Sequence, residues 1–97
     1  MNYIYLLQEI EFIKSKEKIY KIGRTENNVR MPRYPKRSVL LLQRICDDCV
    51  NIEINIIHLF KEKYKHRKDI GNGYFEGDYG EMIKEIDDII TNGVKEE

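Results

Sequence analysis

The fold of this chain is decided by two apolar stretches near its N-terminus, Tyr3-Ile4-Tyr5-Leu6-Leu7 and Ile19-Tyr20-Lys21-Ile22. Both are rich in aromatic and branched residues, a composition typical of β-strands. The polar segment 14–18 between them predicts a hairpin connection, and Gly23 is expected to end the second strand. We therefore expect an antiparallel β-hairpin at the start of the domain.

The elements expected after this hairpin are mostly helical. A short helix is predicted over 29–34, a third strand over 38–45, and a longer helix from Asp47 or Asp48 to about Tyr64. A brief extended piece is expected over 74–76. The last helix is predicted to begin after Asp78, which stands three residues before Glu81 as in a capping box. This order predicts an α+β domain with an antiparallel sheet.

Length and composition narrow the class of protein. The 97 residues are enough for a single domain, which we place over 1–97. Hydrophobic residues make up 41% and charged residues 35% of the chain, a profile typical of folded, soluble domains. Apolar runs such as 39–42 are far shorter than the roughly 20 residues that span a bilayer. No secretion signal is recognised. We expect no membrane partner and an intracellular protein, cytoplasmic or nuclear in a host cell.

The charges balance overall but are unevenly distributed. The chain has 17 basic and 17 acidic residues. Segment 21–44 contains seven basic residues and one acidic residue, and segment 61–68 contains five and one. Such blocks can form a basic face that binds a polyanion, although solvated surface charge is the simpler explanation.

A carboxylate occupies an unusual position on the helix expected after Asp48. At about 100° per residue, the apolar side chains closest to Glu53 lie within about 60° of it, namely Cys49, Val50, Ile56, Ile57, Phe60 and Tyr64. Glu53 is therefore predicted in the middle of an apolar stripe, where an ionised carboxylate is costly unless it is paired or binds a metal. A functional carboxylate and a glutamate that reaches a neighbouring arginine are both consistent with this position.

The two cysteines, Cys46 and Cys49, have the spacing of one half of a zinc site. The helical geometry turns His58 away from Cys49, and the spacing to His66 is long, so we do not expect zinc. Two cysteines are also too few for a disulfide framework, and reduced thiols are expected. The glycines lack phosphate-loop spacing, so no organic cofactor is predicted.

Four motifs follow one another in the chain: Tyr3-Ile4-Tyr5, Tyr20-Lys21-Ile22-Gly23-Arg24-Thr25, Arg30 and the helical Glu53. In this order they resemble the GIY-YIG nuclease superfamily, over residues 2 to about 76. The chain is most similar to a branch found in phages and large DNA viruses, often beside KilA-N or Bro-type domains. The segments 34–36 and 74–77 also look like that branch. The resemblance implies a small three-stranded antiparallel sheet flanked by helices and a viral or phage protein.

The resemblance also implies roles for single residues. Glu53 is expected to bind one Mg²⁺ or Mn²⁺ ion, which suits a single carboxylate because Mg²⁺ keeps several waters. The expected catalytic residues are Tyr5, Lys21, Arg24 and Arg30, although Arg33 could replace Arg30. Tyrosine, with a pKa of about 10, is a poor base unless a nearby cation lowers that pKa, and Tyr5, Tyr20 and Lys21 all stay open as support for the base. Because Lys21 alternates with Ile22, Lys21 is predicted to share the face of Tyr5. The candidate DNA-binding residues are Arg33, Lys36 and Arg37.

We therefore predict a divalent-metal-dependent DNA endonuclease or nickase. Cutting both strands from one active site needs either a homodimer or two successive nicks. The alternative is a catalytically inactive module on the same scaffold that binds DNA or another protein. An intact, open metal site at Glu53 would favour the enzyme.

Overall fold

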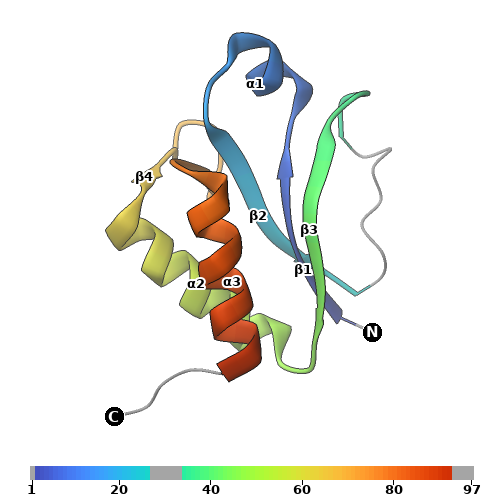
Figure 1. Ribbon diagram of the computed structural model, residues 1–97, viewed down its shortest axis with the longest axis vertical. Helices are drawn as coiled ribbons and strands as arrows, with labels where there is room; N and C mark the ends of the chain where they lie inside the picture. Colours follow the sequence, from blue (N-terminus) through green and yellow to red (C-terminus); the bar gives the residue numbers. More distant parts are fainter. Residues whose placement is uncertain (1, 27–33, 93–97) are drawn as a thin grey trace.

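The two apolar stretches near the N-terminus form the centre of the sheet (Figure 1). The computed structural model describes residues 2–26 and 34–92. In it β1 (Asn2–Gln8) pairs antiparallel with β2 (Ile19–Thr25). The expectation that Gly23 ends the second strand is wrong, because Gly23 stays in the ladder opposite Tyr5.

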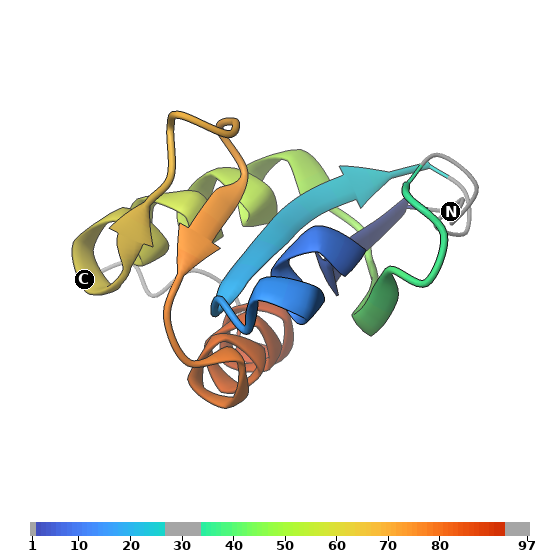
Figure 2. The same cartoon turned by 90° about the horizontal axis from the view of Figure 1, so that it is seen from above.

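The connection between these strands contains a helix rather than a simple turn. α1 (Ile10–Ser15) lies at the end of the hairpin in Figures 1 and 2 and buries Phe12. Lys16 ends this helix in the left-handed conformation, and its backbone N–H donates to the carbonyl of Ile13. The polar segment 14–18 is therefore partly the last turn of α1, which corrects the predicted hairpin connection.

Within the described residues the sheet has five strands, not the three that were expected. β3 (Val39–Cys46) pairs with β1, β5 (Tyr74–Glu76) pairs with β2, and β4 (Lys65–His66) pairs with β5, all antiparallel. The order is β3-β1-β2-β5-β4, and Figure 2 shows β4, β5 and β2 in succession. β5 confirms the extended piece predicted over 74–76, whereas β4, with two residues, is too short for a hydrophobic pattern. Both strands form because a hairpin completes the edge of β2. The expected α+β class is confirmed.

Two long helices complete the domain. α2 (Cys49–Lys63) follows Asp48, as predicted, and α3 (Tyr79–Asn92) follows Asp78. The Oδ2 atom of Asp78 accepts the backbone N–H of Glu81 at 3.1 Å, which confirms the predicted start of the last helix. The short helix predicted over 29–34 lies outside the described residues except for its last residue.

Both long helices cover the same face of the sheet. α2 and α3 contact each other, as Figure 1 shows. The core that they form with the sheet contains Ile4, Leu6, Tyr20, Ile22, Cys46, Cys49, Ile56, Phe60, Phe75, Met82 and Ile86. The side chains that alternate with the strand residues of this core point to the opposite face, where the candidate site begins.

Candidate active site at the edge of strand β2

β1 and β2 present different side chains on their two faces. In their register Tyr5 lies opposite Gly23, and Leu7 lies opposite Lys21. Directly opposed residues of an antiparallel pair share a face, while neighbours along a strand alternate. Lys21 therefore lies on the same face as Tyr5, as the alternation predicts. We call this the Tyr5 face, and we call the other, which carries Ile22, the helix face.

Tyr20 lies on the helix face, away from the other two candidates for the base. Its side chain is part of the core and is 6% exposed. Burial raises the pKa of Tyr20, and the nearby Tyr79 and Asp78 raise it further. A phenol with a raised pKa keeps its proton. The geometry therefore separates Tyr20 from Tyr5 and Lys21.

The ring of Tyr5 lies across the backbone of Gly23. A Cβ atom at position 23 would clash with the ring and with its hydroxyl oxygen, so this close approach requires glycine. The hydroxyl groups of Tyr5 and Tyr34 are hydrogen-bonded at 2.7 Å, and the two rings meet edge to face. The Tyr5 hydroxyl is thus hydrogen-bonded to Tyr34 and lies against Gly23. No sequence pattern indicates Tyr34, because its proximity to Tyr5 depends on the tertiary fold.

Lys21 is half-buried on the Tyr5 face. Its Nζ atom lies 5.3 Å from the centre of the Tyr74 ring, within the range of a cation–π interaction. A Cβ atom at position 73 would lie 2.6 Å from the same Nζ, so Gly73 makes room for the lysine. Burial lowers the pKa of Lys21, whereas the charges of Glu53 and Glu9 oppose this shift. The ammonium therefore lies near two carboxylates from different parts of the chain.

Tyr74 and Glu9 form a wall beside Lys21. The Tyr74 hydroxyl donates to the Oε2 atom of Glu9 at 2.5 Å, and its ring meets the ring of Phe12 edge to face. Burial raises the pKa of Tyr74, and the hydrogen bond to Glu9 adds to this effect. Tyr74 is therefore a fixed phenol donor. No sequence pattern predicts this contact, because 65 positions separate Glu9 from Tyr74.

Arg24 and Glu53 form an ion pair at the end of β2 that pairs with β1 but not with β5. Among the described strands, β5 pairs with β2 only over Ile19–Lys21, so the last residues of β2 are paired with β1 alone. The Nε atom of Arg24 lies 3.3 Å from the Oε1 atom of Glu53. The arginine side chain is 43% exposed and the glutamate side chain 22% exposed. This ion pair links the uncovered end of β2 to α2.

Glu53 lies within the apolar stripe of α2 but is not fully buried there. The buried residues of this helix are Cys49, Ile56 and Phe60, whose mean direction is about 40° from Glu53 at 100° per residue. Ile57, about 40° to the other side of Glu53, also packs against the core. Only Val50 departs from the predicted stripe, because its side chain is 49% exposed. The side chain of Glu53 is 22% exposed and is therefore accessible to both Arg24 and solvent.

The chemistry of Glu53 fits a hydrated divalent cation. Mg²⁺ takes oxygen ligands and is often held by one or two carboxylates with several waters. Over residues 2–26 and 34–92, no group of three or more His, Cys, Asp or Glu side chains is arranged to hold a metal. A site built on one carboxylate does not require such a group. A cation at Glu53 would, however, have to share that carboxylate with Arg24.

The basic residues are less concentrated in space than in sequence. Lys36 and Arg37 are exposed and follow Tyr34 after one proline, whereas Arg30 and Arg33 lie outside the described residues. In the second block, Lys63 pairs with Glu85 at 2.9 Å, and Arg67 pairs with Asp69 and Glu76. The block 61–68 is therefore partly neutralised.

The two cysteines form a disulfide at the junction of β3 and α2. Cys46 is the last residue of β3, and Cys49 is the first residue of α2. The expectation of reduced thiols is thus not met in this structure, because the spacing and the turn bring the two sulfurs together. Glu53 follows Cys49 by one helical turn.

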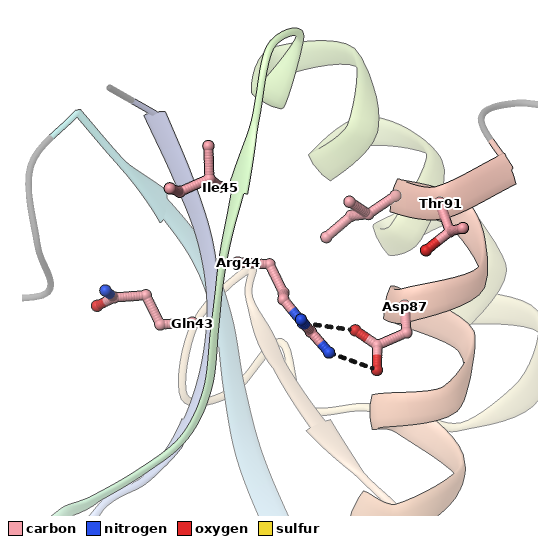
Figure 3. Close-up of a pocket in the computed structure, with 6 residues that line it drawn as sticks. Gln43, Arg44, Ile45, Asp87 and Thr91 are labelled. Carbon is pink, nitrogen blue, oxygen red and sulfur yellow. Dashed lines mark hydrogen bonds and ion pairs between the residues drawn. The ribbon is translucent and has the colours of Figure 1, made fainter.

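A separate open groove lies on the helix face between β3 and α3. It is lined by Gln43, Arg44, Ile45, Asp87, Ile90 and Thr91. Figure 3 shows Arg44 reaching Asp87 through two hydrogen bonds, while Gln43 points to the other side of the sheet. Since Gln43 lies opposite Tyr5 in the register, the groove and the Tyr5 face are on opposite sides.

Comparisons of the chain with protein-family models, curated proteins and solved structures gave no significant match. The resemblance to the GIY-YIG superfamily therefore stays a prediction. In the part of the chain that the structure describes, every helix is too short or too polar to cross a membrane.

Proposed function

We propose that this domain is a Mg²⁺- or Mn²⁺-dependent nuclease that hydrolyses phosphodiester bonds in DNA. The observation that carries the proposal is the position of Lys21, which shares the face of Tyr5 and lies near the carboxylate of Glu53, the partner of Arg24. Three separate elements supply these side chains. A phenol, two cations and a partly exposed carboxylate can supply a base, charge stabilisation and a metal ligand for phosphate hydrolysis.

The reaction breaks one bond at phosphorus and forms another. The oxygen of a water molecule bonds to phosphorus, the bond to one ester oxygen breaks, and the products are a phosphomonoester and an alcohol. A base takes the proton of the water, and the departing oxygen takes a proton in turn. We assign the base to Tyr5 in its deprotonated form, which the ammonium of Lys21 on the same face favours electrostatically.

The two remaining groups stabilise charge. The guanidinium of Arg24 has the fork geometry that binds two nonbridging oxygens of a phosphate. When bound at Glu53, a divalent cation supplies Lewis-acid stabilisation and a more acidic water. Arg30, which lies outside the described residues, is proposed as a further phosphate-binding arginine.

The proposal is tested with purified protein and supercoiled plasmid DNA. We expect nicking with Mg²⁺ or Mn²⁺, none with EDTA, and loss of nicking in Glu53→Ala without loss of the fold. Glu62→Ala is the matched control, because Glu62 is an exposed carboxylate on the same helix. Circular dichroism melting shows whether each variant is folded.

The outcome separates the enzyme from its alternatives. Equal nicking by wild type and Glu53→Ala would contradict the assigned site. DNA binding without cleavage in any divalent metal would favour an inactive DNA-binding module, and the absence of both would favour a protein-interaction domain. The appearance of nicked circles before linear DNA would show successive nicks, whereas direct linearisation would favour a homodimer.

A further inference from the structure

Arg24 forms an ion pair with Glu53, the carboxylate that the proposed metal site needs. In β2 its side chain alternates with Gly23 and so belongs to the helix face, from which it reaches α2. Its Nε atom lies 3.3 Å from the Oε1 atom of Glu53. A guanidinium and a divalent cation are both positive, and both seek the oxygens of the same carboxylate. Their simultaneous binding is therefore opposed by charge repulsion.

We propose that Arg24 and a divalent cation exchange at Glu53. In the absence of metal, Arg24 pairs with Glu53 and holds this partly exposed carboxylate in place. Were Glu53 to hold a cation, the guanidinium of Arg24 would be released, and its N–H donors would be available to bind a phosphate. This inference rests on the proposed function, since it assumes that Glu53 is the metal ligand.

The surroundings of Arg24 allow such a movement. The side chain is 43% exposed, and ion pairs at this level of exposure are weak. Arg24 precedes Thr25, the last residue of β2, and it lines a small hollow with Asp47, Asp48 and Cys49. The hollow offers the released guanidinium space and nearby acidic groups until a phosphate is present. Arg24 is thus a positioning residue for Glu53 in one state and a phosphate ligand in the other.

The exchange is tested by direct measurement of Mn²⁺ binding to the full chain. Free Mn²⁺ is followed by electron paramagnetic resonance during titration of wild type and Arg24→Gln. We expect Arg24→Gln to bind Mn²⁺ about two- to fivefold more tightly, because the weak competing ion pair is gone. Arg24→Lys, which keeps the positive charge, should bind nearly as wild type does.

Arg44→Gln is the matched control. Arg44 is also exposed and pairs with a carboxylate, Asp87, but it lies on β3 beside α3. Its replacement changes the net charge equally and should leave the Mn²⁺ affinity unchanged. A second measurement follows the Nε–H signal of Arg24 by nuclear magnetic resonance, which should shift on addition of Mg²⁺ in wild type and not in Glu53→Gln.

The results distinguish this inference from the proposed function. If Arg24→Gln binds Mn²⁺ no more tightly than wild type, the exchange is wrong while the metal site stands. If Glu53→Gln binds Mn²⁺ as well as wild type, Glu53 is not the ligand, and both the metal assignment and the exchange are wrong. An equal increase in Mn²⁺ affinity in Arg24→Gln and Arg44→Gln would show a general effect of net charge and would also overturn the proposed exchange.

Discussion

The ammonium group of Lys21 is half-buried between the ring of Tyr74 and the carboxylates of two glutamates. Burial lowers the pKa of Lys21, and Glu53 and Glu9 act against that shift. The protein thus brings a positive charge to the Tyr5 face at a cost in desolvation, which an exposed lysine would not incur. Such a placement is typical of a side chain that acts through its charge.

Replacement of Lys21 by methionine tests this role. Lys21→Met keeps most of the side-chain volume against Tyr74 but removes the charge. We expect a melting temperature close to that of wild type and a turnover lower by roughly 10²–10³, as for the loss of one electrostatic contact to a transition state. The measurement is the initial rate of plasmid nicking in Mn²⁺. Lys14→Met, at an exposed position of α1, is the control, and full activity in Lys21→Met would contradict the role.

The alternation of side chains along a strand was sufficient to predict that Lys21 lies on the same face as Tyr5. This position depends only on residues that are close in the sequence and on the pairing of two adjacent strands. The partners that complete the site could not be predicted in this way. Tyr34 reaches Tyr5 across 29 positions, and Glu9 reaches Tyr74 across 65. Such contacts depend on how the whole sheet is assembled, and no periodicity in the chain encodes them.

At the scale of the elements, long segments were predicted better than short ones. The strands β1 and β3 and the helices α2 and α3 have enough residues for a pattern to repeat. The two helices also begin after an acidic residue, Asp48 or Asp78. β4 and β5 have two and three residues, and α1 has six. Segments of this length form because neighbouring elements complete their hydrogen bonds. Local sequence could therefore indicate the class of the fold and the extended piece over 74–76, but not β4 or the pairing of these two strands in the sheet.

The disulfide between β3 and α2 leads to a prediction at this scale. Cys46 and Cys49 close a loop of four residues, for which chain entropy alone predicts a stabilisation of about 2 kcal/mol. We expect dithiothreitol to lower the free energy of unfolding of the wild type by about that amount, measured by urea denaturation. The Cys46→Ala, Cys49→Ala double variant should be insensitive to the reductant. Equal stability of the wild type in both conditions would show that the bond adds nothing.

At the scale of the whole molecule, the charge blocks of the sequence separate into paired and exposed groups. Glu85, from the acidic C-terminal part, neutralises Lys63, while Asp69 and Glu76 neutralise Arg67. Lys36 and Arg37 are exposed beside the segment that carries Tyr34. A count of charges along the chain could not show this difference, because pairing is a tertiary property. Among the described residues, Lys36 and Arg37 are therefore the exposed basic pair that follows Tyr34, the hydrogen-bond partner of Tyr5.

The salt dependence of DNA binding tests which basic block contacts the phosphates. Each lost phosphate contact lowers the slope of log K against log salt by about 0.9. We expect the double variant Lys36→Gln, Arg37→Gln to flatten the slope by up to about twice this amount, which corresponds to two lost contacts. The slope is measured by fluorescence anisotropy with a labelled duplex in Ca²⁺. The matched control is Lys61→Gln with Lys65→Gln, an equal change of charge at exposed positions. Lys65 lies in β4, whereas Lys36 precedes β3 at the opposite edge of the sheet. Flattening by the control pair alone would place the DNA at the β4 edge, away from Tyr5, and would contradict the proposed active site.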